Sequence, residues 1–159
     1  MNYRHGFHAG NHADVLKHLV LVALLDSFKR KDAAFFVLDS HAGRGRYDLA
    51  GGQASKTGEA KAGIRRLWAA APTQPPALTR YLAALAATQA DAPDSYPGSP
   101  LLVSQALRAQ DWFASCEVVA DEAAALKALV PKFDLYDTGS RINQHPWIAD
   151  LVIWRANKL

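Results

Sequence analysis

The chain has 159 residues, of which 50% are hydrophobic and 21% are charged, and this composition is typical of one globular domain and excludes a disordered or fibrous protein. The first residues are not followed by an apolar segment, and the longest apolar run, residues 19–25, is too short to span a bilayer, so we expect neither a secretory signal nor a membrane anchor. Cys116 is the single cysteine, which excludes an intrachain disulfide framework and predicts a cytoplasmic protein.

The net charge of +3 is unevenly distributed along the sequence. Residues 1–66 contain 11 Lys and Arg against 6 Asp and Glu, whereas residues 67–159 contain 7 against 9. Five of the six histidines also lie in the basic half. Such a basic lobe suits a polyanionic partner such as RNA, although many small proteins are mildly basic without binding one.

The amino-terminal elements are predicted from glycines, a capping residue and an apolar stripe. Residues 1–10 contain two glycines and two aromatic residues, and we expect an extended arm. Asn11 is a favourable N-cap for a helix that ends near Lys29, with Asp14 placed three residues later as in a capping box.

A buried strand is predicted at residues 35–38, because this short run is continuously apolar. The glycine-containing turn at residues 39–46 follows directly. A strand that leads into such a turn is typical of the ligand-binding edge of an open α/β sheet.

The middle of the chain is predicted to be a helical insertion over residues 50–95, with helices at 58–71 and 77–90 separated by prolines. A further helix is expected to begin at Ser99 as its N-cap, with Pro100 at the first helical position.

The carboxyl-terminal part is predicted to alternate strands and a helix. We expect strands at 112–119, 133–136 and 148–154 and a helix at 121–130. The sequence therefore predicts one α/β domain with a parallel sheet.

Two candidate ligand contacts lie at strand ends. Gly43 and Gly45 let the backbone approach a ligand closely, and Asp39 either accepts from a ligand amine or fixes the turn. Glu117 is placed to accept both ribose hydroxyls of a nucleoside. Each feature also has a purely structural interpretation, as turn geometry or as an exposed strand-end carboxylate, but both point to one crevice.

The histidine-rich start admits three interpretations: a zinc site, surface or capping histidines, and contacts to phosphate or base. His8 and His12 are four residues apart, but Gly10 between them opposes the helix that this spacing requires, so we expect no metal site. The mixture of cationic and flat side chains at Tyr3, Arg4 and His5 suits RNA.

Four motifs make the sequence resemble the ribosomal RNA large subunit methyltransferase J family over about residues 1–130. They are the opening segment from Tyr3 to His18, Leu38-Asp39-Ser40-His41-Ala42-Gly43-Arg44-Gly45-Arg46-Tyr47, Thr57-Gly58-Glu59, and Tyr96-Pro97-Gly98-Ser99-Pro100.

The resemblance implies a Rossmann-like S-adenosylmethionine-dependent methyltransferase fold, with a helical insertion after the first strand. It implies methylation of the N6 amine of an adenine in 23S ribosomal RNA. By position in the motifs, the cofactor contacts would be His18, His41, Ser99 and Glu117, and Tyr3 would meet the RNA.

The sequence departs from the family in lacking its catalytic Asp-Pro-Pro-Tyr motif, which follows the fourth strand. Residues 133–159 match the family poorly, and residues 155–158 stand where the motif is expected. We therefore expect a truncated, monomeric domain with an incomplete sheet. It is either a methyltransferase or a remnant that binds cofactor or RNA without turnover, and a partly folded product of gene decay is a weaker third alternative.

Overall fold

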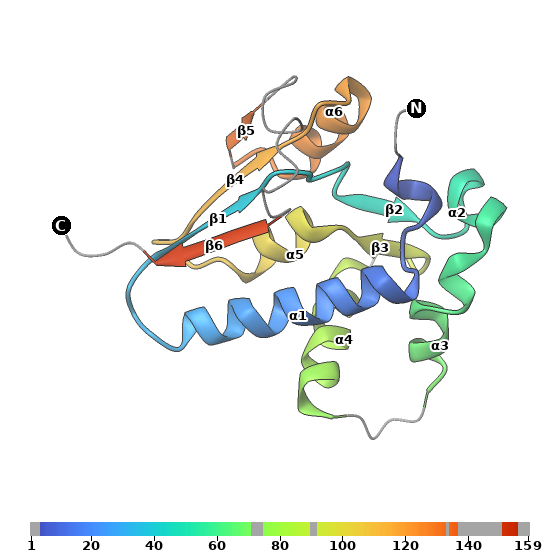
Figure 1. Ribbon diagram of the computed structural model, residues 1–159, viewed down its shortest axis with the longest axis horizontal. Helices are drawn as coiled ribbons and strands as arrows, with labels where there is room; N and C mark the ends of the chain where they lie inside the picture. Colours follow the sequence, from blue (N-terminus) through green and yellow to red (C-terminus); the bar gives the residue numbers. More distant parts are fainter. Residues whose placement is uncertain (1–3, 71–74, 90–91, 133, 137–150, 156–159) are drawn as a thin grey trace.

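The computed structural model describes residues 4–70, 75–89, 92–132, 134–136 and 151–155 (Figure 1). Within these ranges, no helix is long and apolar enough to cross a membrane.

The fold is centred on a sheet with the strand order β5-β4-β1-β6 in the described part of the chain (Figure 1). Strands β1 (Phe35–Asp39), β4 (Trp112–Cys116) and β5 (Asp134–Tyr136) are parallel. The expected α/β class is thereby confirmed. The strand predicted at 112–119 ends earlier, at Cys116, so Glu117 lies just beyond the strand and not inside it.

Strand β6 (Leu151–Arg155) forms on the free side of β1, but it runs antiparallel to β1. Leu151 pairs with Asp39 and Arg155 pairs with Phe35, so β6 ends beside the start of β1. Residues 155–158 were expected to stand in the position of the catalytic motif. For Arg155 this expectation is wrong, because Arg155 lies beside the amino end of β1 and a pocket lies at the carboxyl end. Residues 148–150 and 156–158 lie outside the described residues.

The helix predicted before β1 and the helix predicted after β4 are confirmed. Helix α1 (His12–Lys29) begins at the predicted N-cap, where the Asn11 side chain accepts from the Asp14 backbone amide. Helix α6 (Ala120–Leu129) follows β4. Leu21, Val22 and Leu25 of α1 are buried in the main core together with Phe35 and Val37 of β1, so the buried face of the helix shares one core with the sheet.

The arm and the insertion differ from their predictions in detail. Residues His5–Phe7 form a short 3-10 helix, η1, so the arm is not extended. The helix predicted at 58–71 is instead broken into η2 (Glu59–Lys61) and α3 (Ile64–Trp68), and the short helix α2 (Gly52–Thr57), which was not predicted, precedes it. Gly58 takes a left-handed conformation at φ +67°, which ends α2, and the backbone of Gly10 and Asn11 packs directly against Gly63.

Helix α4 (Pro76–Gln89) completes the insertion as predicted, and it packs against α1. Its buried Tyr81 and Leu85 join the main core. Together α2, η2, α3 and α4 supply the helical insertion that the fold class implies.

A two-stranded antiparallel sheet of β2 (Arg46–Asp48) and β3 (Ser95–Pro97) was not predicted. It pairs Tyr47 with Tyr96 at the two ends of the insertion. Both aromatic residues are buried, so this ribbon closes the insertion onto the core beside the carboxyl end of β1 (Figure 1).

Candidate functional site

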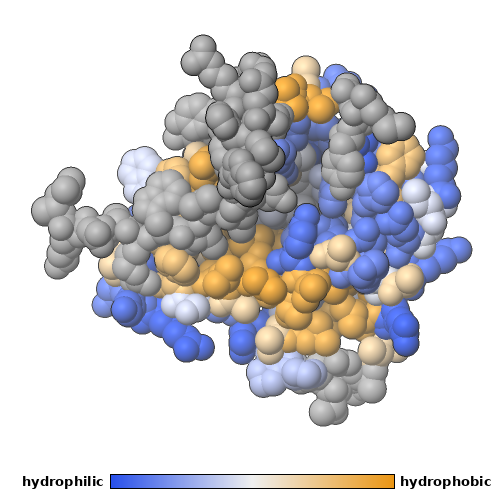
Figure 2. Space-filling model, viewed as in Figure 1, coloured by the Kyte–Doolittle hydropathy of each residue, from blue (hydrophilic) through white to orange (hydrophobic). Residues whose placement is uncertain are grey.

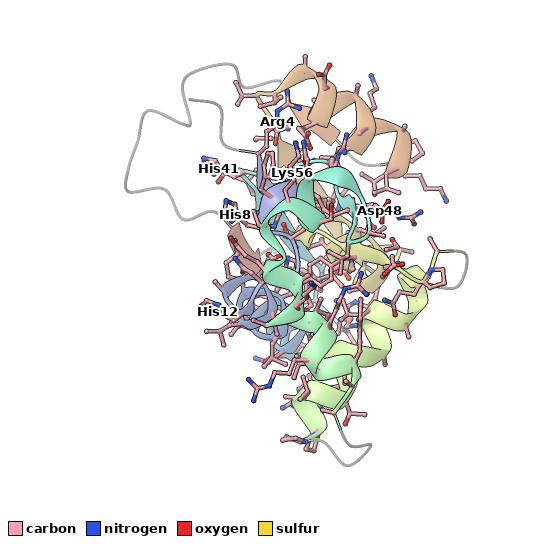
Figure 3. All side chains as sticks on the ribbon, turned by 90° about the vertical axis from the view of Figure 1, so that its right-hand side faces the viewer. Arg4, His8, His12, His41, Asp48 and Lys56 are labelled. Atoms are coloured by element: carbon pink, nitrogen blue, oxygen red, sulfur yellow. The ribbon has the colours of Figure 1, made fainter. Side chains whose placement is uncertain are left out.

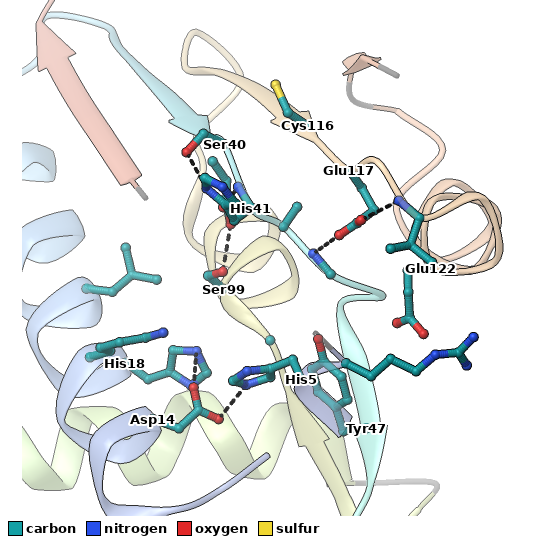
Figure 4. A pocket seen from close by; sticks show the side chains of 18 of the residues that line it. His5, Asp14, His18, Ser40, His41, Tyr47, Ser99, Cys116, Glu117 and Glu122 are labelled. Carbon is teal, nitrogen blue, oxygen red and sulfur yellow. Dashed lines mark hydrogen bonds and ion pairs between the residues drawn. The ribbon is translucent and has the colours of Figure 1, made fainter. Parts of the chain in front are cut away.

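A pocket of about 910 Å³ opens at the carboxyl ends of the parallel strands β1 and β4 (Figure 4). One wall is the face of α1 that carries Leu16, His18 and Val20, and the opposite wall is formed by residues 116–119 and Glu122. This edge is where open α/β sheets bind their ligands.

The pocket brings together most of the predicted site residues. Arg4, His5, His18, His41, Gly43, Ser99 and Glu117 all line it. Two predicted residues are not among them: Gly45 does not line the pocket, and Tyr3 lies outside the described residues.

The turn after β1 is fixed by the buried carboxylate of Asp39. This carboxylate accepts from the His41 backbone amide at 3.2 Å and from the Ser99 hydroxyl at 2.6 Å. Of the two roles considered for Asp39, these contacts correspond to fixing the turn. They also join the turn to the start of helix α5 (Ser99–Ala106).

Ser99 does not cap α5, contrary to the sequence prediction. Gly98 is the N-cap residue, and Ser99 is the first residue of the helix. The hydroxyl of Ser99 donates to the Asp39 carboxylate, and within the described ranges no side chain accepts from the backbone amides at the start of α5.

Glu117 connects the two strand ends directly. One carboxylate oxygen accepts from the Gly43 amide at 2.8 Å, and the other accepts from the Val119 amide at 2.7 Å (Figure 4). Each oxygen of an ionised carboxylate has room for a second donor. Glu117 is half-buried, so it combines an anchoring contact with a face toward the pocket.

The two glycines of the turn have different surroundings. Both adopt positive φ, +63° at Gly43 and +77° at Gly45. Gly43 faces the pocket, and a Cβ there would overlap the Tyr47 hydroxyl. A Cβ on Gly45 would instead lie 2.9 Å from Leu126 and Leu129, so Gly45 allows α6 to approach the turn.

A buried polar chain passes behind the α1 wall of the pocket. The His5 ring lies 3.1 Å from the Asp14 carboxylate, whose other oxygen lies 3.5 Å from His18 Nε2 (Figure 4). His18 Nδ1 lies 2.9 Å from the Tyr96 hydroxyl, which is 3.0 Å from the Tyr81 hydroxyl. Burial lowers the pKa of His18 to about 4, against the opposing charge of Asp14, so this ring is neutral at pH 7.

Cationic and polar side chains of the amino-terminal segment lie beside the insertion. Figure 3 shows Arg4, His8 and Lys56 on the face formed by η1 and α2, which are in contact. His8 Nδ1 lies 3.0 Å from the Glu59 carboxylate, and His41 is exposed at the rim of the pocket. In the described ranges, no three His, Cys, Asp or Glu side chains gather as metal ligands.

The sequence interpretation missed several pocket residues. Asp14 was treated only as a capping partner, although its side chain accepts from the Gly10 amide and lines the pocket. Tyr47 and Glu122 also line it, and Glu122 pairs with Arg44 at 3.2 Å. No local pattern marks these residues, because contacts between distant segments create their roles.

The chain is similar to known proteins both in sequence and in structure. The chain is 45% identical over 113 residues to ribosomal RNA large subunit methyltransferase J of Haemophilus influenzae, and 46% identical over 112 residues to the protein of the same name from Escherichia coli. Each alignment covers 70% of this chain and 40% of the relative. The chain therefore spans less than half the length of these curated relatives.

The solved structure of protein LPL1258 from Legionella pneumophila is also similar, with a TM-score of 0.71 and 34% sequence identity. The match covers 80% of this chain and 47% of that one. A family model described as ribosomal RNA large subunit methyltransferase D, RlmJ, matches residues 32–134. With this match over more than half of its residues, the chain belongs to the RlmJ family of ribosomal RNA large subunit methyltransferases.

Proposed function

We propose that the pocket binds S-adenosylmethionine, and that the chain functions in S-adenosylmethionine-dependent methylation of the N6 amine of an adenine in 23S ribosomal RNA. The observation that carries this proposal is the contact of Glu117 with the Gly43 amide, because it unites an acid and a glycine turn from two parallel strands in one crevice. The family and the names of the relatives agree with this chemistry.

The residues present suit a nucleoside with an amino acid tail. Glu117 would accept from the ribose hydroxyls, and Gly43 would permit close approach of the ligand to the turn. His18, His41 and Ser99 would form further walls of the cofactor site. When bound, the cofactor supplies an electrophilic methyl group.

The RNA partner is proposed to contact the amino-terminal segment. Arg4 is exposed beside the pocket, and His5 lines it together with Arg4. Cationic side chains pair with phosphates, and flat rings stack on unpaired bases. Tyr3 belongs to the same predicted RNA contact by the family resemblance.

A second candidate function is binding without turnover. The sequence lacks Asp-Pro-Pro-Tyr, and β6 runs antiparallel, so its last residue, Arg155, lies at the edge of the sheet opposite the pocket. Positioning of reacting groups contributes roughly 7–11 kcal/mol to catalysis in favourable cases, so a site without the positioning groups would retain binding and lose rate.

Calorimetric titration of S-adenosylmethionine tests the cofactor site. We expect Glu117→Ala to weaken binding by about tenfold or more, because each lost hydrogen bond to a charged group contributes roughly 1.5–3 kcal/mol. Asp121→Ala is the matched control, since this carboxylate is exposed on the first turn of α6 and does not line the pocket. Equal affinities of wild type and Glu117→Ala would refute the ribose role.

Methyl transfer from labelled S-adenosylmethionine to unmodified 23S ribosomal RNA separates the two candidate functions. Incorporation of label by this chain supports the methyltransferase. Binding of cofactor or RNA without incorporation supports the binding role, whereas a wild-type chain that binds neither contradicts both functions.

A further inference from the structure

Asp14 places a carboxylate in the α1 wall of the pocket with little access to water. The residue is 2% exposed and lines the pocket. Its Oδ2 accepts from the Gly10 amide at 3.0 Å and lies 3.1 Å from His5 Nε2. Its Oδ1 has no hydrogen-bond partner and has His18 Nε2 at 3.5 Å.

The Asp14 carboxylate is ionised at neutral pH. Burial by itself would raise the pKa of this carboxyl group. The hydrogen bond from His5, the attraction of the His18 and His5 rings when these are protonated, and the hydrogen bond from the Gly10 amide outweigh burial and lower the pKa to about 2. The ion pairs found for Asp14 in the described residues involve histidines and no Lys or Arg.

His18 does not balance this negative charge. Its ring is neutral at pH 7, because burial lowers its pKa to about 4. The ring is held by the hydrogen bond between Nδ1 and the Tyr96 hydroxyl, which in turn shares a hydrogen bond with the Tyr81 hydroxyl.

Lys and Arg side chains around the pocket are too exposed to neutralise the negative charge of Asp14. Asp39 is also 2% exposed, whereas the cations that line the pocket, Arg4 and Lys17, are exposed. Exposed charges are screened by water and salt much more than buried ones are. Among the described lining residues, the carboxylates of Asp14, Asp39 and Glu122 are therefore buried, whereas neither Lys nor Arg is.

We propose that Asp14 is a specificity-determining residue whose buried carboxylate favours a ligand with a positive charge at the sulfur position over its neutral counterpart. The inference rests on the proposed cofactor, since S-adenosylmethionine is a sulfonium cation and S-adenosylhomocysteine, the product of methyl loss, is a neutral thioether. Such a preference promotes exchange of product for methyl donor.

Calorimetry with three ligands tests the role of Asp14: S-adenosylmethionine, S-adenosylhomocysteine, and sinefungin, which carries an ammonium group in place of the sulfonium. Asp14→Asn keeps an oxygen for the Gly10 amide and removes the charge. We expect it to weaken both cations by about tenfold and the neutral ligand by less than twofold. The matched control is Asp26→Asn, a carboxylate on α1 that pairs with Lys29 and Arg80 away from the pocket.

An equal loss of affinity for all three ligands, or no loss for any, would overturn the inference and leave the proposed function intact. A wild-type chain that binds none of them contradicts the proposed function itself. If thermal unfolding shows that Asp14→Asn does not fold, the affinities of the wild-type chain for the three ligands test the inference. Cations that bind more tightly than S-adenosylhomocysteine support the inference, and equal or tighter binding of the neutral ligand overturns it.

Discussion

His18 is a buried histidine whose role in stability can be separated from its proposed role in the pocket. Its ring lies between Asp14 and Tyr96, and it stacks on the Tyr96 ring at a centroid distance of 5.5 Å. The sequence placed His18 on the first helix but did not indicate burial. Burial was not predictable, because Tyr96, which covers the ring, belongs to β3 and is remote in sequence.

Acidification should destabilise the protein through His18. Because burial lowers its folded-state pKa to about 4, below the usual 6.5, the unfolded chain binds the proton first as the pH falls. The stabilising contribution is full above about pH 6.5 and is lost as the pH falls toward 4. Between pH 7 and pH 5, we expect a loss of about 2 kcal/mol in the free energy of unfolding.

Urea denaturation at pH 7 and pH 5 measures this loss. His18→Gln should show a loss that is smaller by about 2 kcal/mol, whereas His12→Gln, which changes an exposed residue on the same helix, should behave like wild type. If wild type and His18→Gln lost the same free energy of unfolding between pH 7 and pH 5, the pH dependence would not come from His18.

Among the elements, those with a strong local signal were predicted and those without one were missed. Helix α1 has a capping residue and an apolar stripe, and residues 35–38 of β1 are continuously apolar. Strands β2 and β3 have three residues each, too few for a recognisable pattern, so their pairing depends on the insertion that brings their ends together.

The N-cap of α1 provides a test at this scale. The Asn11 side chain accepts from the Asp14 amide at 2.8 Å and donates to Glu59 at 2.9 Å, so it joins the helix to η2. We expect Asn11→Ala to lower the free energy of unfolding by about 1–2 kcal/mol in thermal or urea denaturation.

Asn11→Ser is the matched variant for this cap. It should restore the cap but not the contact with Glu59, and so recover part of the loss. Full recovery by serine would show that the contact with Glu59 contributes nothing.

For the molecule as a whole, the apolar surface and the charge distribution are both uneven. Figure 2 shows hydrophobic residues gathered over α1, where Leu16, Val20 and Leu24 are exposed and line the pocket. The basic residues are concentrated in the first 66 positions. The expectation of a monomer stays a prediction, which sedimentation of the purified chain would check.

Removal of residues 1–8 should weaken binding to 23S ribosomal RNA more than binding of S-adenosylmethionine. This change deletes Arg4 and His5, and the loss of one phosphate contact should lower the slope of log affinity against log salt by about 1. Titrations at several salt concentrations measure the slope, with Arg80→Gln on α4 as the control. Unchanged RNA affinity after the truncation would exclude the segment from the interface.

The sequence by itself determined the fold class, the family and the strand-end position of the glycine turn and Glu117, because these features depend on local patterns and contiguous motifs. Only the tertiary structure decided that Gly45 serves packing, that Ser99 binds Asp39, and that Asp14 is a buried carboxylate at the pocket. It also decided the antiparallel direction of β6. The physical reason is that burial, charge balance and strand direction depend on segments far apart in the chain, which no local pattern specifies.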